Sequence, residues 1–179
     1  PAQLLSLLVS VPDLWIGVFG HWGLGWLDTS MPALVWVAAS AAWISTMFAA
    51  LGGASGRQRL ALVTVAVTAW AMPTRILFLS GAAVGQEVQP RYLLPLFLLG
   101  AIVACSGFGD RAASLERSQR WLIVALLAVA NSVALHVNLR RYVTADDVAA
   151  LDLGSAAEWW WRTSISPQLV WVVGSLGFL

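Results

Sequence analysis

The chain has 179 residues, of which 59% are hydrophobic and only 11% are charged. A soluble domain carries about 25% charged residues, and the apolar residues here gather in runs close to the ~20 residues that cross a bilayer, so an ordinary soluble protein is excluded and an integral membrane protein is predicted. The net charge of +1 gives no indication of nucleic-acid binding, all ten basic residues are arginine, as is typical of a GC-rich bacterial genome, and the single Cys105 excludes an internal disulfide.

The first 27 residues are apolar, but their pattern is not that of a clean span. Pro12, Asp13 and four glycines interrupt the run, and three tryptophans crowd its second half, as is typical of the headgroup region. The sequence therefore predicts an interfacial or re-entrant segment over residues 1–27. The alternative is a membrane helix that ends near Gly20.

Four longer apolar runs follow, separated by short polar stretches. A run close to 20 residues predicts a transmembrane helix, because a helix rises about 1.5 Å per residue and the bilayer core is about 30 Å thick. The expected spans are residues 31–51, 60–82, a rather short 92–107, and 121–138, with a partial fifth span from residue 165. The predicted fold is therefore all-α, a polytopic transmembrane helix bundle with about four complete spans. We expect residues 1–179 to form a single transmembrane domain that is a piece of a longer polytopic protein.

Small residues recur at spacings of three and four in two of these runs. One stripe comprises Ala38, Ala42, Ser45, Ala49 and Gly53, and a shorter one comprises Gly100, Ala104 and Gly107. Such stripes let a neighbouring helix approach closely. Trp36 and Trp43 lie on a different face of the first span, which suits lipid or a looser neighbour.

The arginines in the short loops predict an orientation. Loops 52–59 and 108–120 hold five arginines, whereas loop 83–91 holds one. The positive-inside rule then places loop 83–91 and the 139–164 segment outside the cytoplasm, in a multi-pass protein of the bacterial inner (plasma) membrane. Arg140 and Arg141 weaken this asymmetry.

Arg75 is the most costly residue of the chain because it lies inside the predicted span 60–82. An arginine near the bilayer centre costs about 2.5–3.5 kcal/mol on insertion scales. Pro73 removes a helix hydrogen bond and can open a backbone carbonyl toward the guanidinium. One interpretation is an anion site; the other is an arginine that snorkels to the headgroups or pairs with a carboxylate.

Arg91 lies directly before the third predicted span, within the stretch VQPRYLLPLF. Pro90 suits the first turn of a helix, and the N–H groups of a helix start favour anions. The planar donor fork of Arg91 suits phosphate, and Tyr92 adds a hydroxyl at headgroup depth. These residues predict a corner that binds a lipid phosphate, with Arg75 as a further candidate. The alternative is an ordinary interfacial Arg–Tyr anchor.

No motif of a soluble enzyme is present, such as a phosphate loop, HExxH, CxxC or GxSxG. The sequence therefore identifies no catalytic residue and predicts no metal site and no cofactor. His21 and His136 are isolated and are interpreted as packing or interface residues. Asp28 is interpreted as a cap of the first span, with a catalytic role as the alternative.

The segment 139–164 is acidic and rich in tryptophan. We expect its acidic residues to form a solvated surface, and these are Asp146, Asp147, Asp152 and Glu158. The run Trp159-Trp160-Trp161 is interpreted as a membrane-interface anchor or as a platform that stacks on a sugar ring.

Several stretches together resemble a bacterial membrane family, domain-of-unknown-function family 2142. These are GHWGLGWLDTSMP, VQPRYLLPLF, LRRYV and the Trp-rich segment before SPQL, in the order in which they stand in the C-terminal half of that family. The usual glycine before Arg-Tyr is Pro90 here, and a segment of the type W-x-PP reads TSISPQ. The resemblance implies an envelope membrane protein but no established activity.

The element Arg-Tyr-x-x-Pro is also similar to one in polytopic glycosyltransferases of the C-type fold. Such enzymes use a polyprenyl-phosphate sugar at the outer face and hold the lipid phosphate with basic residues. This resemblance implies a glycosyltransferase-like enzyme in which Arg91, Tyr92 and Arg75 bind the phosphate of the donor. The alternatives are a transporter or flippase of an envelope lipid or glycan, and a non-catalytic subunit of a membrane complex. Expected partners are membrane lipids, the polyprenyl-linked donor and other membrane subunits.

Overall fold

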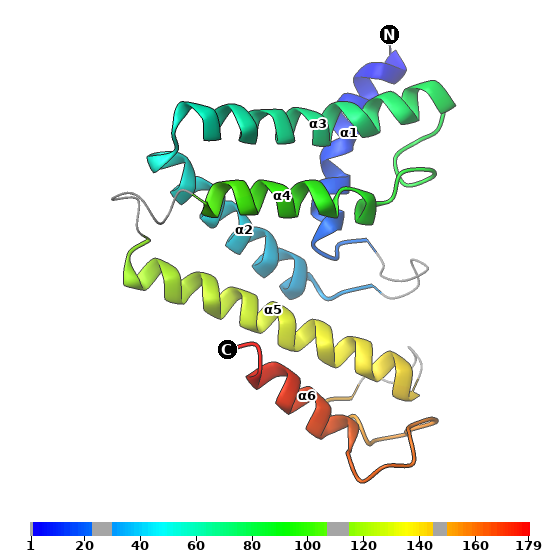
Figure 1. Cartoon of the computed structure of the whole chain (residues 1–179). Helices are drawn as coiled ribbons and strands as arrows, with labels where there is room; N and C mark the ends of the chain where they lie inside the picture. The colour runs from blue at the N-terminus through cyan, green and yellow to red at the C-terminus, as the bar shows by residue number, and fades with distance from the viewer. Residues whose placement is uncertain (1, 23–29, 107–114, 145–149) are drawn as a thin grey trace.

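The computed structural model describes residues 2–22, 30–106, 115–144 and 150–179. Its elements are α1 (Ala2–Val18), α2 (Ala33–Gly53), α3 (Gly56–Ser80), the 3-10 turn η1 (Pro90–Tyr92), α4 (Leu94–Cys105), α5 (Arg117–Thr144) and α6 (Pro167–Leu176). No strand occurs within the described ranges, and the prediction of an all-α fold is confirmed (Figure 1).

Three helices are long and apolar enough to cross a membrane. They are α2, α3 and α5, with 21, 25 and 28 residues. At about 1.5 Å per residue, each exceeds the ~30 Å of a bilayer core. The chain is therefore a helical membrane protein, as its composition predicted.

The expected span 92–107 is shorter than predicted. It consists of η1 followed by α4, which has only 12 residues and rises about 18 Å. Two prolines explain the late start of α4. Pro90 opens a 3-10 turn in which Tyr92 and Leu93 donate to the carbonyls of Gln89 and Pro90, and Pro95 lacks an N–H.

The fourth expected span is longer than predicted. Helix α5 extends from Arg117 to Thr144, so the first six residues of the segment 139–164 continue the helix instead of forming a polar loop. The sequence missed this because the polar side chains of Arg140 and Arg141 looked like the start of a loop, although arginine favours helix.

The end of α1 agrees with the alternative prediction, a helix that ends near Gly20. The helix runs through Pro12 and ends at Val18. Gly20 has φ of 105°, a left-handed conformation that glycine adopts without steric cost. Figure 1 shows α1 crossing α3 at a steep angle, whereas α3 and α4 run nearly parallel and α5 is tilted relative to them.

Two apolar cores hold the helices together. The first joins α1, α3, η1 and α4, and its buried residues are Leu7, Val11, Leu14, Ala69, Leu77, Val88, Leu93 and Phe97. The second joins α2 to α5, and its buried residues are Met31, Val35, Ala38 and Ala130. Ala38 and Ala42 are 2% and 1% exposed, so the predicted small-residue stripe does face neighbouring helices.

Helix α6 packs against α5 through a polar contact. The indole of Trp171 donates to the carbonyl of Ser132 (2.9 Å), and the hydroxyl of Ser175 donates to the Ser132 hydroxyl (3.0 Å). A Cβ atom at Gly174 would lie 2.7 Å from Leu135 Cδ2, so glycine permits this close approach.

Candidate functional site

The turn η1 presents Arg91 and Tyr92 at the start of α4. Val88, Pro90 and Leu93 on either side of them are buried, whereas Arg91 and Tyr92 are exposed. The guanidinium carbon of Arg91 lies 5.6 Å from the centre of the Tyr92 ring, within cation–π range. The buried neighbours therefore anchor the turn and leave these two side chains projecting outward together.

Trp22 connects this turn to the end of α1. A Cβ atom at Gly17 would collide with the ring of Pro90 and lie 2.8 Å from Trp22 Cδ1, and a Cβ atom at Gly85 would collide with the edge of the Trp22 ring. Gly85 also has φ of 93°, which favours glycine. These four residues form what we call the Trp22 contact, and it fixes Pro90 against α1.

The backbone N–H groups of the turn contribute less than the sequence predicted. The amides of Tyr92, Leu93 and Leu96 already donate to carbonyls within the turn, at 2.9–3.0 Å, and Pro90 and Pro95 have no N–H. The 3-10 turn thus consumes donors that a regular helix start would leave open. A phosphate here would depend on the Arg91 guanidinium and the Tyr92 hydroxyl.

The third predicted site residue, Arg75, lies on the outward face of α3. Its side chain is exposed, whereas the neighbouring Pro73, Thr74 and Leu77 are buried. It lies about 7.5 Å before the end of α3 at Ser80, within reach of the headgroups for a snorkelling arginine. The structure thus brings Arg91 and Tyr92 together but does not bring Arg75 into the interface between α1, α3 and α4.

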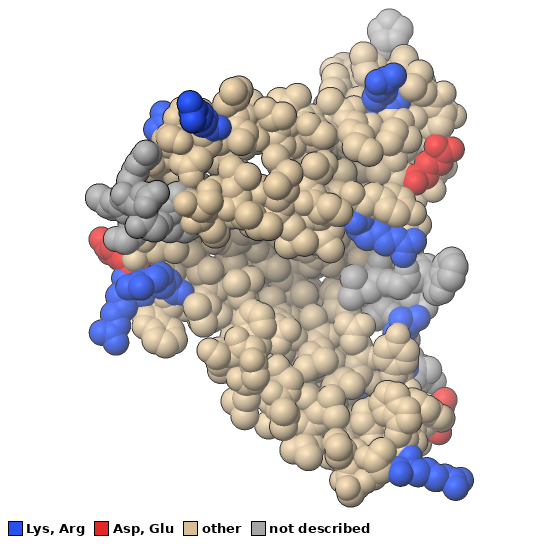
Figure 2. Space-filling model, in the orientation of Figure 1, with Lys and Arg blue, Asp and Glu red and all other residues tan. Residues whose placement is uncertain are grey.

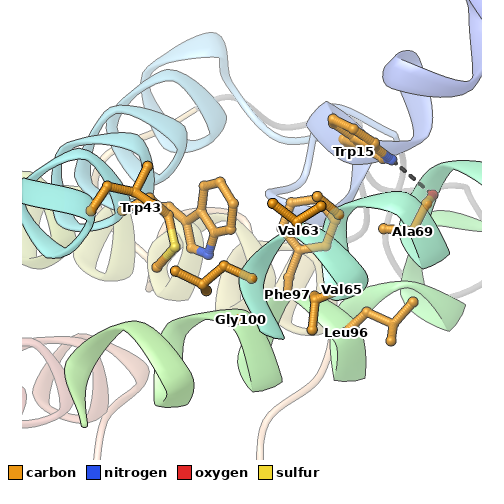
Figure 3. A pocket seen from close by; sticks show the side chains of 12 residues that line it. Trp15, Trp43, Val63, Val65, Ala69, Leu96, Phe97 and Gly100 are labelled. Carbon is orange, nitrogen blue, oxygen red and sulfur yellow. Dashed lines mark hydrogen bonds between the residues drawn. The ribbon is translucent and has the colours of Figure 1, made fainter. Parts of the chain in front are cut away.

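The carbonyl released by Pro73 does not turn toward Arg75, contrary to the sequence prediction. Pro73 cannot donate to Ala69 four residues earlier, and the Ala69 carbonyl instead accepts from the indole nitrogen of Trp15 at 3.0 Å (Figure 3). Arg75 itself is exposed on α3, whereas Ala69 is buried.

The same arrangement occurs in reverse on α1. Pro12 releases the carbonyl of Leu8, which accepts from the indole nitrogen of Trp70 at 3.0 Å. The rings of Trp15 and Trp70 meet edge to face with centroids 5.2 Å apart. Each helix therefore carries a proline that opens one carbonyl and a tryptophan that satisfies the carbonyl of the other helix.

An apolar cavity of about 250 Å³ lies among α2, α3 and α4, with Trp15 of α1 at one side (Figure 3). The residues that line it are Trp15, Trp43, Met47, Leu51, Leu62, Val63, Val65, Ala66, Ala69, Leu96, Phe97 and Gly100. We call it the apolar pocket. Val63 and Ala66 are exposed on α3, so its opening faces the surroundings of a membrane-spanning helix.

Trp43 belongs to this pocket, so the expectation that it faces lipid or a loose neighbour is wrong. Its ring lies 5.0 Å from that of Phe97, and its indole nitrogen is buried without a hydrogen-bond partner among the described residues. Gly100 faces the same packing, and a Cβ atom there would meet Val65 and Trp43 at ordinary contact distances of 3.6 and 4.0 Å.

Arg140 is a buried polar residue that sequence reasoning did not single out. It is 6% exposed, and its Nη1 donates to the carbonyl of Asp152 at 2.7 Å. The only indication in the sequence was its place in LRRYV. Its role here is to attach the segment after α5 to the end of that helix.

His136 takes part in helix packing, whereas the described acidic residues of the segment after α5 lie at the surface. His136 contacts the Leu151 carbonyl through Nε2 at 2.9 Å, and its ring lies 5.0 Å from that of Trp171, which supports its interpretation as a packing residue. Asp152 and Glu158 are exposed, as expected. Asp28, Asp146 and Asp147 lie outside the described residues, and no group of three metal-binding side chains occurs within the described ranges.

The tryptophans at 159–161 form a small aromatic surface. The ring of Trp161 meets those of Trp159 and Trp160 at 4.9 and 4.8 Å. Trp159 and Trp161 are 52% and 58% exposed. Both interpretations of this run, an interfacial anchor and a sugar platform, need exposed rings.

Comparison with known proteins gives one match. The model of the family described as "Predicted membrane protein (DUF2142)" matches residues 4–100, more than half of the 179-residue chain. The match includes the stretches GHWGLGWLDTSMP and VQPRYLLPLF, whereas LRRYV lies beyond it. No curated protein and no solved structure matches the chain.

Proposed function

We propose that this chain, which belongs to the predicted membrane protein family DUF2142, binds the phosphate of a polyprenyl-linked sugar and takes part in glycosyl transfer in the bacterial envelope. The observation that carries the proposal is the turn η1, where Arg91 and Tyr92 project together from a buried anchor. A guanidinium fork beside a phenol offers several donors to a phosphate group.

The apolar pocket suits the other part of such a lipid. Leu96, Phe97 and Gly100 of its wall belong to α4, the helix that begins directly after Arg91 and Tyr92. Along this helix a cation is thus followed by an apolar wall, which is the order of groups in an amphiphile. A cavity of about 250 Å³ is many times the space that one water molecule needs, enough for several carbon groups of a prenyl chain.

The arginines of the short loops between spans support an extracytoplasmic position for this turn. In Figure 2 the arginines gather toward the two ends of the helices, and an uncharged band lies between them. Arg57 and Arg59 begin α3, and Arg117 and Arg120 begin α5, next to the short loops at the ends opposite to η1. Arg91, Arg140 and Arg141 lie toward the η1 end, so the asymmetry rests on the short loops that connect the spans. By the positive-inside rule the ends opposite to η1 lie in the cytoplasm.

The two alternative functions fit less well. A transporter or flippase needs a polar route that continues between the leaflets, whereas the pocket among α2, α3 and α4 is lined only by aliphatic and aromatic residues and a glycine. A purely structural subunit would employ Arg91 against a partner protein instead of a phosphate.

Glycosyl transfer also requires a base to activate the acceptor, and no residue is assigned to that role.

The proposal predicts that Arg91 determines the affinity for polyprenyl phosphate. The full-length protein in lipid nanodiscs is titrated with undecaprenyl phosphate, and bound lipid is counted by native mass spectrometry. Arg91→Ala should weaken binding about 10- to 100-fold, since hydrogen bonds to charged groups contribute about 1.5–3 kcal/mol. The affinity of Arg91→Lys should lie between those of wild type and Arg91→Ala, because an ammonium group keeps the charge but loses the planar donor fork.

Arg162→Ala is the matched control, because Arg162 is an exposed arginine remote from η1 in the sequence. It should leave the affinity within about twofold, as expected for a screened surface charge. Equal affinities of wild type and Arg91→Ala would contradict the proposal.

A further inference from the structure

A second cavity, of about 460 Å³, lies between α1 and the residues that follow α3. It is lined by Gln3, Ser6, Leu7, Ser10, Asp13, Trp22, Gly81, Ala82, Ala83 and Val84. We call it the polar cavity. Unlike the apolar pocket, it combines a carboxylate, an amide and two hydroxyls with one indole ring.

The polar residues form one stripe along α1. Gln3, Ser6, Ser10 and Asp13 follow one another at spacings of three and four, so they share one face of the helix. Leu7, Val11 and Leu14 pack into the apolar core from an adjacent face. Gln3, Ser6 and Asp13 are exposed and Ser10 is half-buried, so these polar groups are accessible to a ligand and are not occupied in packing helices together.

The stripe leads to the turn that carries Arg91. Asp13 and Gly17 are four residues apart and lie on the same face of α1, and Gly17 contacts the ring of Pro90. Trp22 both lines the polar cavity and belongs to the Trp22 contact that fixes Pro90. Trp22 and Pro90 therefore link the polar cavity to the turn that carries Arg91 and Tyr92.

We propose that the polar cavity binds the sugar ring of the lipid that Arg91 holds by its phosphate. A carboxylate only accepts hydrogen bonds, whereas hydroxyl and amide groups both donate and accept, and this set matches the hydroxyls of a sugar. The indole of Trp22 offers an apolar surface to the ring carbons. A single negative charge at Asp13 excludes the phosphate itself from the cavity, which leaves the phosphate at Arg91.

This inference rests on the proposed function, and a comparison of two lipids separates them. The full-length protein in nanodiscs is titrated with undecaprenyl phosphate and, in parallel, with undecaprenyl-phosphate glucose, galactose and mannose. Wild type should bind at least one sugar-bearing lipid about tenfold more tightly than the bare lipid, since hydrogen bonds to a charged group discriminate by about that factor. Asp13→Asn should reduce this ratio to near one and keep the affinity for the bare lipid.

Two further variants complete the test. Glu87→Gln removes a carboxylate from the exposed loop before η1, outside the cavity lining, and should keep the full ratio. Ser10→Ala is a milder change in the cavity and should lower the ratio even if Asp13→Asn folds poorly, which thermal unfolding in the same nanodiscs would reveal.

The possible results show which of the two proposals fails. If no sugar raises the affinity of wild type, or if Asp13→Asn and Ser10→Ala both keep the preference, the polar cavity does not bind the sugar. The proposed function then still stands, provided that Arg91→Ala weakens the binding of the bare lipid. If Arg91→Ala leaves every affinity unchanged, the proposed function itself fails.

Discussion

At the scale of single residues, the prolines within helices decide which backbone carbonyls lose their helix hydrogen bond. Pro12 and Pro73 each open a carbonyl in an apolar interface, where an unsatisfied acceptor is costly. Sequence reasoning recognised that Pro73 would release a carbonyl but assigned it to Arg75. An indole is the better donor there, because it satisfies the carbonyl without bringing a charge into the interface.

We predict that Trp15 and Pro73 are coupled energetically. Trp15→Phe removes the donor and leaves the Ala69 carbonyl unsatisfied, whereas Pro73→Ala restores a backbone N–H that can reach the same carbonyl. Trp15→Phe should therefore destabilise less in the Pro73→Ala background. The coupling free energy should be about 0.6 kcal/mol and at most about 1.7 kcal/mol, the average and the maximum for hydrogen bonds between membrane helices. Unfolding in sodium dodecyl sulfate, followed by circular dichroism, measures it.

The reciprocal pair supplies the control for this cycle. Pro12 releases the carbonyl that Trp70 uses, so Trp15→Phe combined with Pro12→Ala should be close to additive, and Trp70→Phe with Pro12→Ala should show coupling. A coupling between Trp15 and Pro12 as large as that between Trp15 and Pro73 would contradict the pairing.

At the scale of elements, the end of α5 organises the segment that leads to α6. The carbonyl of Val143 accepts from the amides of Glu158 and Trp159 at 2.8 and 3.1 Å, and Arg140 holds the Asp152 carbonyl from the same turn. The segment 150–166 contains no helix, yet these bonds tie it to α5. The tryptophan run 159–161 is therefore positioned by α5 as well as by its own contacts.

We predict that Arg140→Ala loosens this segment without unfolding the bundle. Loss of the Arg140 hydrogen bond should cost about 1.5–3 kcal/mol locally, as for other bonds to charged groups. Amide hydrogen exchange of residues 151–159 should rise, because their attachment to α5 is weakened, whereas exchange in α2 and α3 should stay at the wild-type rate.

Arg141→Ala provides a comparison at the neighbouring position. Its guanidinium lies over the Tyr142 ring at 5.6 Å, on a residue that is 64% exposed, so its removal should change exchange in 151–159 much less. Equal exchange rates in both variants would show that Arg140 does not hold the segment.

At the scale of the whole molecule, the sequence predicted the fold class and the three long helices because run length and composition determine both. It placed Arg91 and Tyr92 at the start of a helix, and they lie in the 3-10 turn just before α4. It could not predict the apolar pocket or the polar cavity, because each depends on which helices pack together, and apolar periodicity carries no information about partners. Asp13 is the clearest case: in the sequence it only interrupts an apolar run, and the packing of α1 beside the residues that follow α3 places it in the lining of the polar cavity.

The final prediction concerns the orientation of the molecule in the membrane. In a Cys105→Ser background, which removes the exposed native thiol, single cysteines are placed at Glu87, Ser164 and Ser118. All three positions are exposed; the first two belong to the ends predicted to be extracytoplasmic, and Ser118 lies beside Arg117 and Arg120. A membrane-impermeant maleimide applied to right-side-out vesicles should label Glu87→Cys and Ser164→Cys directly, and Ser118→Cys only after permeabilisation, because the arginines keep that end in the cytoplasm. The reverse pattern would place the Arg91–Tyr92 pair at the cytoplasmic leaflet and exclude glycosyl transfer at the outer face. If Glu87→Cys and Ser164→Cys were labelled from opposite sides, the prediction that η1 and the segment after α5 lie on the same side would be wrong.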